Sequence, residues 1–465
     1  MKHIITSKNV SFGYLHMEES FLKAIDLKID KGECVLICGP SGSGKSTFSR
    51  LLNGISPNYF EGRLEGELLT FDLKAGESDI EEYVPLVASV FQNPKTQHFT
   101  VDTTSELAFP LENMGMDPED IVDKINQKAS AFKVEHLLGR NIFELSGGEK
   151  QQIAFVSSMM LDPGVLILDE VTSNLDQEAI TRIRDMIKLL KKQGMTIVMM
   201  EHRLAWTKDL VDRYVLLEDG KIVNQWSANS FKQLSNQELH DLGLRSMSLQ
   251  SHREKIDDKS LKQNAQDGRL KAENLSIGYE NRKVLSDLNI SFKEGEIACL
   301  FGSNGIGKTT LANTLTGFQP PLSGRILWDG KELSKNQLIE KSYLVMQDMN
   351  YQLFSDSVID EILLGAKYPD HKDEIMSVLN LTEFKDRHPM SLSEGQKQRV
   401  AIASALLSGK KLIIFDEPTS GLDYFHMEQF GLLLNKLKET KAVIIVITHD
   451  EELASKWCDY YIRLD

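Results

Sequence analysis

The sequence predicts an α/β protein of two tandem domains, each with a mostly parallel sheet at its centre. Short β-branched runs such as "ECVLICG", "VLILD" and "TIVMM" alternate with longer helical patterns such as "DQEAITRIRDMIKLLKKQG". This alternation is typical of parallel strands buried between helices. The chain also repeats itself, because "ICGPSGSGKST" recurs as "LFGSNGIGKTT" and "LILDEVTSNLD" recurs as "IIFDEPTSGLD". Such a repeat indicates that one unit of structure is duplicated.

The intervals between the repeated segments show how far the duplication extends. From the serine of "LSGGE" to the aspartate of "LILDE" is 23 residues, and the interval from "LSEGQ" to "IIFDE" is the same. A histidine follows that aspartate after 33 residues in both copies. The earlier part is less regular, since Lys45 precedes Gln92 by 47 residues and Lys308 precedes Gln347 by 39. Insertions and deletions collect in surface loops, so this interval should hold the variable loops.

The domain boundaries follow from changes in composition. We expect a first domain at residues 1–246, which ends in the helix-like "SFKQLSNQELHDLGL". The polar, charge-mixed stretch at residues 247–267 is typical of a linker. A second domain should then occupy residues 268–465.

Composition limits the function classes. At 465 residues, with 41% hydrophobic and 26% charged residues, the chain is long enough for two cores and has the profile of a globular protein. Its 53 basic and 68 acidic residues give a formal net charge of −15. An acidic surface repels phosphate backbones, so we expect no nucleic acid as the main partner.

The sequence also predicts a cytoplasmic location. No stretch approaches the ~18 continuous apolar residues that span a bilayer, and the N-terminal "MKHIITSKNVSF" lacks the apolar core of a signal peptide. Three of the four cysteines lie in apolar runs, which suits buried thiols in a reducing compartment. Contact with a membrane would therefore run through a partner.

Two glycine-rich segments predict phosphate binding. Each follows an apolar strand and opens a helical pattern, so its backbone N–H groups can surround phosphate oxygens at a helix N-terminus. A lysine there neutralises the β- and γ-phosphates, and the next hydroxyl can bind Mg²⁺. One such match could be a simple turn, but two in register favour phosphate. The residues concerned are Gly39, Ser41, Gly42, Gly44, Lys45, Ser46 and Thr47 in the first copy, and Gly302, Asn304, Gly305, Gly307, Lys308, Thr309 and Thr310 in the second.

An Asp-Glu pair ends a strand in each copy. Asp169 and Asp416 would emerge at the carboxyl edge of the sheet, where ligands bind in open α/β folds, and could hold Mg²⁺. Glu170 and Glu417 follow and could polarise an attacking water. The alternative is a solvated turn, which the position relative to the phosphate loops argues against.

In their order, these motifs resemble the ATP-binding cassette (ABC) ATPase family over nearly the whole chain outside the linker. The resemblance implies that two P-loop domains, each with an antiparallel β edge and a helical signature subdomain, bind and hydrolyse ATP with Mg²⁺. It implies Mg²⁺ binding by Ser46, Gln92, Asp169, Thr309, Gln347 and Asp416, and contact with the γ-phosphate by His202 and His449. Tyr14 and Tyr279 resemble platforms for adenine, and the alternative is packing on the strand edge. Asp176 and Asp423 match the loop that crosses between cassettes.

The family also implies that ATP lies between the phosphate loop of one cassette and the signature motif of the other, head to tail. Ser146, Gly147 and Gly148 would then face the second loop, and Ser393 and Gly395 the first. Glu394 stands where the first motif has a glycine. Its carboxylate either weakens closure by repulsion or points away from a favourable helix N-terminus. We expect two competent but unequal sites.

The segments after the two glutamines favour a subfamily. "FQNPKTQHFTVDTTSELAFPLEN" and "MQDMNYQLFSDSVIDEILLG" each hold a second glutamine and then an aromatic residue. They resemble the ATPases of energy-coupling factor (ECF) transporters, which import vitamins, vitamin precursors or transition-metal ions. The resemblance implies a polytopic membrane scaffold and a small substrate-binding membrane subunit as partners, on the cytoplasmic face of the membrane.

The side chains that would meet these partners are Phe91, Pro94, Phe99, Leu107 and Phe109, although the same residues could simply pack the helical subdomain. The rival function is a twin-cassette ATPase that acts on ribosomes or nucleic acid. Ribosome-acting relatives carry a long basic connector, whereas the stretch at residues 247–267 is short and mixed in charge.

Overall fold

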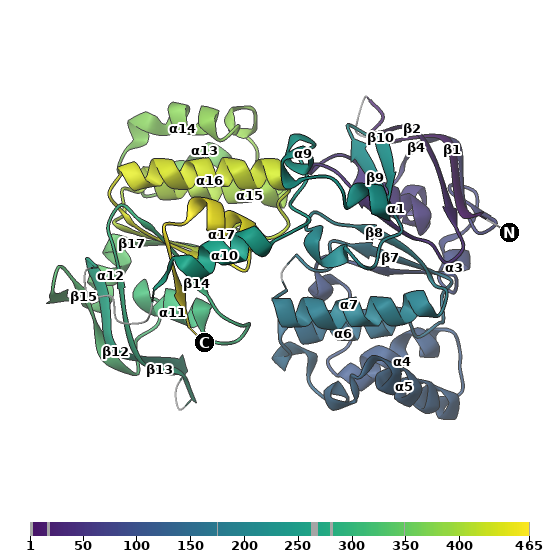
Figure 1. Cartoon of the computed structure of the whole chain (residues 1–465), viewed down its shortest axis with the longest axis horizontal. Helices are drawn as coiled ribbons and strands as arrows, with labels where there is room; N and C mark the ends of the chain where they lie inside the picture. The colour runs from purple at the N-terminus through teal and green to yellow at the C-terminus, as the bar shows by residue number, and fades with distance from the viewer. Residues whose placement is uncertain are drawn as a thin grey trace. The chain divides into compact units, whose positions relative to one another are not determined.

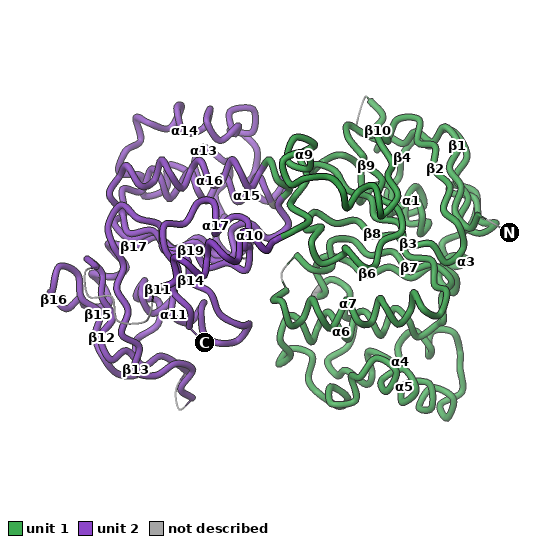
Figure 2. Tube along the Cα trace, viewed as in Figure 1, with its two compact units in different colours: residues 1–248, 423–425 green, residues 249–422, 426–465 purple. Residues whose placement is uncertain are grey.

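A computed structural model of the chain describes residues 3–15, 19–173, 175–261, 268–279, 282–347 and 349–464, without the side chains of Lys95, Leu261 and Glu394. The chain forms two compact units (Figure 2). Unit 1 contains residues 1–248 and 423–425, and unit 2 contains residues 249–422 and 426–465. The predicted pair of tandem α/β domains is confirmed.

A mostly parallel sheet forms the centre of each unit. Within the described residues, the unit 1 sheet has six strands, in the order β10 (Lys221–Ser227), β9 (Arg213–Glu218), β3 (Cys34–Cys38), β8 (Thr196–Met200), β7 (Val165–Asp169) and β6 (Val87–Val90). The unit 2 sheet has the order β11 (Ser260–Leu261), β20 (Tyr460–Arg463), β14 (Ile297–Phe301), β19 (Val443–Ile447), β18 (Leu412–Asp416) and β17 (Ser342–Val345). All neighbours pair in parallel except β9 and β10.

An antiparallel sheet forms a second layer in each unit. In unit 1 it has the order β2 (Leu22–Asp30), β1 (His3–Tyr14), β4 (Gly62–Thr70) and β5 (Leu73–Lys74). In unit 2 it has the order β13 (Arg282–Phe292), β12 (Leu270–Tyr279), β15 (Ser323–Trp328) and β16 (Lys331–Glu332). These sheets are the antiparallel edges that the family resemblance implied.

Helices cover the sheets (Figure 1). Those of unit 1 are α1 (Lys45–Leu52), α2 (Ile55–Asn58), α3 (Ile80–Tyr83), α4 (Thr103–Asn113), α5 (Pro118–Phe132), α6 (Gly147–Ser158), α7 (Gln177–Lys192), α8 (Ala228–Phe231) and α9 (Asn236–Asp241). The later helices are α10 (Gln250–Asp258), α11 (Lys308–Leu315), α12 (Lys335–Lys341), α13 (Val358–Leu363), α14 (Lys372–Val378), α15 (Glu394–Leu407), α16 (Tyr424–Glu439) and α17 (Glu451–Trp457). Figure 1 shows α6 beside α7, with α4 and α5 packed next to α6.

Burial explains why the central strands are almost entirely apolar. Every residue of β3, β8, β18 and β19 is buried, because helices or the antiparallel sheet cover both faces. The four cysteines are buried and free. None of the described helices combines the length and apolar character that a membrane crossing requires.

The stretch at residues 247–267, which we expected to be a linker, contains secondary structure that packs on unit 2. Helix α10 contacts α17, where Nε of Arg253 lies 2.7 Å from Oε2 of Glu451. Strand β11 pairs with β20. Residues 262–267 lie outside the described residues, and the chain divides between residues 248 and 249.

Candidate functional site

The two predicted phosphate loops join a buried central strand to a helix. In unit 1 the loop runs from β3 to α1, which has Gly44 as its N-cap, and in unit 2 it runs from β14 to α11, which has Gly307. Both glycines have positive φ, 107° and 111°, and an added Cβ would lie 2.5 Å from the side chain of Leu22 or Val284. Glycine is therefore required there, and the first N–H groups of each helix remain available for an anion.

The other predicted phosphate-binding residues occupy the same loops and first helical turns. They are Gly39, Ser41, Gly42 and Thr47 in unit 1 and Gly302, Asn304, Gly305 and Thr310 in unit 2.

The loop lysines are buried and held by loop carbonyls. The Nζ of Lys45 donates to the backbone oxygens of Gly39 at 3.0 Å and Pro40 at 2.9 Å. The Nζ of Lys308 donates to Gly302 at 2.7 Å and Ser303 at 3.1 Å. Burial lowers the pKa of Lys45, although the charge of Glu170 opposes this. Each ammonium is thus fixed beside the N–H groups of its loop.

The hydroxyl that follows each lysine meets the strand-end aspartate. Ser46 Oγ donates to Asp169 at 3.2 Å, and Thr309 Oγ1 donates to Asp416 at 2.7 Å. Burial, followed by repulsion from Glu170, raises the pKa of Asp169 to about 6, and burial also raises the pKa of Asp416. A hydroxyl and a carboxylate are hard oxygen ligands, so both pairs fit the preferences of Mg²⁺.

The strand-end glutamates meet the histidines in both units. Oε1 of Glu170 lies 3.1 Å from Nε2 of His202, and Oε1 of Glu417 lies 3.5 Å from Nε2 of His449. Burial alone would raise the pKa of Glu170, but the charge and hydrogen bond of His202, and the charge of Lys45, bring it below its ordinary value. Both glutamates have a φ of +50°, a conformation that persists only where surrounding contacts fix it.

The predicted signature serines are N-caps. Ser146 accepts from the N3 amide of α6, and its own N–H donates to Glu149 at 2.8 Å. Ser393 caps α15 in the same way with Gln396. These capping boxes fix the start of each signature helix.

The glycines after the signature serines differ in how tightly they pack. An added Cβ at Gly147 meets no atom of the described chain within 4 Å, whereas one at Gly148 would lie 2.7 Å from Cβ of Ala179. At Gly395 the nearest atom, in Leu422, would be 3.8 Å away. The position of Gly147 therefore has room for a side chain in the first cassette. Glu394 stands at the matching position of the second cassette, and its side chain lies outside the described atoms.

The remaining predicted residues lie at the edges of the same sites. Gln92 and Gln347 are exposed in the loops after β6 and β17. The hydroxyl of Tyr14 lies 3.0 Å from Thr47 Oγ1, and its ring packs edge-on against Phe12 at 5.1 Å. Tyr279 is 56% exposed, so its ring face is more available than that of Tyr14.

Comparison with known proteins identifies the family. The family model described as "ABC transporter" matches residues 22–173 and 285–420. A Treponema denticola protein provisionally named ABC transporter ATP-binding protein is 42% identical over 99% of this chain and 95% of its own length. The chain belongs to the ABC transporter family. It has two ABC cassettes and is an ABC transporter ATPase.

Two further comparisons place the twin cassette among its relatives. A Bacillus subtilis protein provisionally named HMP/thiamine import ATP-binding protein YkoD is 30% identical over 99% of this chain and 90% of its own length. The solved structure described as a model of ribosome-bound archaeal Pelota and ABCE1 is 20% identical, with a TM-score of 0.69, and covers 97% of this chain and 76% of that chain. The second likeness concerns the fold alone.

The loops that follow β6 and β17 contain contacts that the sequence predicted only in part. The second glutamine, Gln97, accepts from Phe91 N at 3.2 Å and donates to Ser89 O at 2.9 Å, so the loop folds back on β6. Phe99 is 72% exposed and stacks on Phe109, with ring centroids 5.1 Å apart. The same pattern recurs in the second cassette with Gln352 and with Phe354, which is 71% exposed.

The predicted apolar patch is exposed only at Phe99, since Phe91, Pro94 and Phe109 are half-buried, and the prediction omitted the residue that fixes the loop. Leu107 is fully buried in the core, because it lies on the inner face of α4. The missed residue is Glu106, which accepts from Phe99 N at 3.0 Å and from Thr100 N at 2.9 Å. Glu361 accepts from Phe354 and Ser355 in the second cassette. A signal existed, since each glutamate stands nine residues after the second glutamine.

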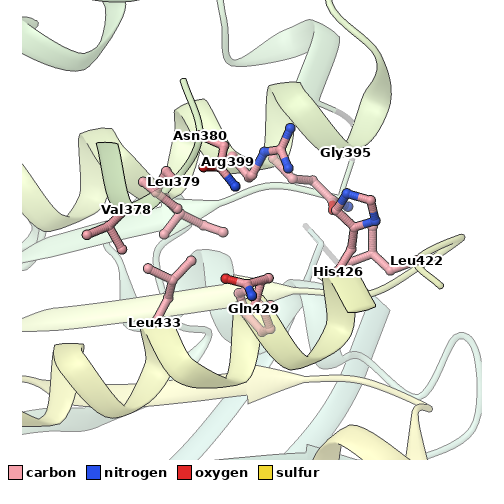
Figure 3. A pocket seen from close by; sticks show the side chains of 12 residues that line it. Val378, Leu379, Asn380, Gly395, Arg399, Leu422, His426, Gln429 and Leu433 are labelled. Carbon is pink, nitrogen blue, oxygen red and sulfur yellow. The ribbon is translucent and has the colours of Figure 1, made fainter. Parts of the chain in front are cut away.

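A pocket lies behind the signature helix α15 of the second cassette (Figure 3). Leu379, Ile402 and Leu433 line it together with His426 and Gln429. In the first cassette the counterparts of Leu379 and Ile402 are Phe132 and Phe155, whose rings pack edge to face with centroids 5.9 Å apart. Two aliphatic side chains thus line the pocket at positions where two aromatic rings pack together in the first cassette.

Proposed function

We propose that this chain is the ATP-hydrolysing subunit of an importer of the energy-coupling factor type, which takes up a vitamin, a vitamin precursor or a transition-metal ion through separate membrane subunits. The observation that carries the proposal is the exposed aromatic side chain, Phe99 or Phe354, held on a fixed loop in each cassette. The partners would be a polytopic scaffold and a small substrate-binding membrane subunit.

The loop contacts support docking of the membrane partners on loops that are ordered before binding. Gln97 donates to the backbone of β6, and Glu106 accepts from the N–H of Phe99. Gln352 and Glu361 make the same two contacts in the second cassette, with β17 and with the N–H of Phe354. A loop that is already ordered loses little conformational entropy when it binds. Large exposed aromatics are costly in water and are typical of contact sites.

We assign the chemistry of each ATP site from the geometry above. Lys45 and Lys308 would bind the β- and γ-phosphates, Glu170 and Glu417 would polarise the attacking water, and the histidines would contact the γ-phosphate. Ser46, Gln92 and Asp169, with Thr309, Gln347 and Asp416, would hold Mg²⁺, which neutralises charge on the phosphates when bound. ATP would be hydrolysed between cassettes that pack head to tail, with each signature serine facing the phosphate loop of the other cassette.

The relative from Bacillus subtilis suggests the first cargo to test. Its name refers to HMP/thiamine import, so a thiamine precursor is our first choice among vitamin precursors. The protein would then act at the cytoplasmic face of the membrane. The rival, action on ribosomes, draws only on a likeness of fold at 20% identity, and the net charge of −15 argues against a polyanionic partner.

A pull-down from native membranes in mild detergent tests the proposal. The unmodified chain should recover a polytopic scaffold and a small membrane subunit, and the F99A/F354A double variant should recover at least about tenfold less of both. Tyr59→Ala is the matched control, because Tyr59 is 75% exposed but lies outside these loops. Recovery of ribosomes without membrane subunits would replace the transporter proposal with its rival.

A further inference from the structure

In each cassette an acidic residue is a direct sequence neighbour of the histidine, but it precedes the histidine in one cassette and follows it in the other. After β8 the chain reads Glu201, His202, Arg203, and after β19 it reads Thr448, His449, Asp450. The acidic residue therefore precedes the histidine in the first cassette and follows it in the second.

Despite this inversion, both carboxylates bind the same threonine of the neighbouring strand end. Thr172 Oγ1 donates to Oε1 of Glu201 at 3.1 Å, and Thr419 Oγ1 donates to Oδ2 of Asp450 at 2.9 Å. All four residues are at most 3% exposed. Each threonine stands two residues after the strand-end glutamate of its cassette. A buried contact made twice from different sequence positions indicates a requirement of the site rather than of the local sequence.

The secondary structure that follows each histidine explains why the acidic residue precedes it in one cassette and follows it in the other. In the second cassette helix α17 begins at Glu451, and Oδ1 of Asp450 accepts from Leu453 N at 3.1 Å as its N-cap. One aspartate can therefore cap the helix and bind Thr419. In the first cassette only a short 3₁₀ turn, η4 (Ala205–Thr207), follows, so no α-helix needs a cap. The position of the aspartate is free for Arg203, and the carboxylate comes from the other side.

The threonine contact closes the turn that holds the strand-end glutamate. Glu170 N donates to Met200 O at 2.9 Å, and Glu417 N donates to Ile447 O at 2.8 Å, which ties the two strand ends once through the backbone. The bond from the threonine to the carboxylate ties them a second time, two residues further on. Between the two ties lies the glutamate in its positive-φ conformation, with its carboxylate beside the histidine.

We propose that Glu201 and Asp450 are equivalent positioning residues. Each fixes the turn after the strand, so that the carboxylate of Glu170 or Glu417 stays beside its histidine. The proposal rests on the function proposed above, in which these two glutamates polarise water. Burial, followed by repulsion from Glu170, raises the pKa of Glu201 well above its ordinary value, which agrees with a role other than that of a charged base.

The first test removes only the threonine hydroxyl. Thr172→Val and Thr419→Val keep the side-chain shape, and each should lower kcat for ATP about tenfold, the cost of one buried hydrogen bond that orients a reacting group. The Kd for ATP without Mg²⁺ should stay within about twofold, because each threonine hydroxyl bonds to Glu201 or Asp450 and not to the phosphate loop. Thr181→Val is the control, since that exposed hydroxyl donates to Gln177 O within α7. Unchanged kcat in both variants would overturn the proposal.

The second test is a rescue. Glu201→Thr should lower kcat as Thr172→Val does, and E201T/T172V should be no worse than either, because the two residues act as one contact. Adding Arg203→Asp to Glu201→Thr gives the first cassette the second cassette's order of residues and should restore at least half of the lost activity. If this rescue failed and ATP binding fell as much as kcat did, the contact between Glu201 and Thr172 would have a purely structural role.

The failure of the underlying function would look different. If Glu170→Gln and Glu417→Gln both left kcat unchanged, the proposed hydrolysis roles would be wrong. The contact would still appear as a non-additive effect of E201T/T172V on the unfolding midpoint.

Discussion

In the first cassette Nε2 of His202 lies 3.1 Å from Glu170, whereas in the second Nε2 of His449 lies 3.5 Å from Glu417 and 3.0 Å from both Lys308 Nζ and Asn304 Oδ1. The second histidine is thus shared among three groups, and the first is paired with its glutamate. The difference shows that duplicated motifs do not guarantee duplicated electrostatics. Burial alone would raise the pKa of Glu170, but the charge of His202 lowers this pKa and so makes Glu170 a weaker base. Because His449 lies farther from Glu417 and also contacts Lys308 and Asn304, we expect the two sites to differ in turnover.

The largest expected effect tests that inequality directly. Glu417→Gln should lower ATP turnover by about 100-fold or more, the usual loss when a general base is removed, and Glu170→Gln should lower it less. Steady-state ATPase assays on both variants at saturating ATP provide the measurement, with ATP affinity measured separately. Equal losses would contradict the view that the cassettes form two competent but unequal sites.

A second prediction compares the anchors of the exposed loops. Glu106→Gln should lower the free energy of unfolding by about 2 kcal/mol at pH 7, because the carboxylate that accepts from Phe99 N and Thr100 N is replaced by a weaker acceptor. Glu361→Gln is the matched variant, since Glu361 accepts from Phe354 N and Ser355 N. Similar losses in urea unfolding would show that both loops are built alike, and a loss in one alone would break the equivalence.

The pH dependence of this effect has a definite sign. Burial alone would raise the pKa of Glu106, but contacts with His98, Thr100 and Phe99 bring it below its ordinary value. A carboxylate with a lowered pKa stabilises the fold above its unfolded pKa, and that contribution is lost as pH falls through the folded value. The stability difference between the unmodified chain and Glu106→Gln should therefore be full at pH 7 and shrink below about pH 4.5. A difference that grew on acidification would contradict this assignment.

The sequence predicted the residues of the candidate sites better than it predicted the side chains that hold the neighbouring loops and turns in place. Phosphate loops, strand-end acids and signature serines are local patterns, and each has a backbone reason that reads directly from residue type, such as the positive φ at Gly44 and Gly307. The partners of Glu106 and the threonine bond of Glu201 join residues 6 and 29 positions apart through side-chain direction. Leu107 was misplaced for the same reason, since successive residues of a helix point about 100° apart and the side of α4 that holds Leu107 faces the core.

The smallest expected effect concerns the pocket behind the second signature helix. Ile402→Phe should stabilise unit 2 by about 0.5–1 kcal/mol, because the added ring fills space that Phe155 fills in the first cassette. The reciprocal Phe155→Ile should destabilise unit 1 by about 1–3 kcal/mol, since it removes a ring that is fully buried and packs on Phe132. Differential scanning calorimetry measures both shifts. If Ile402→Phe instead lowered the transition by several degrees, the side chains around Leu379 would be too closely packed to admit a ring, and the two cassettes would differ in backbone spacing rather than in side-chain size.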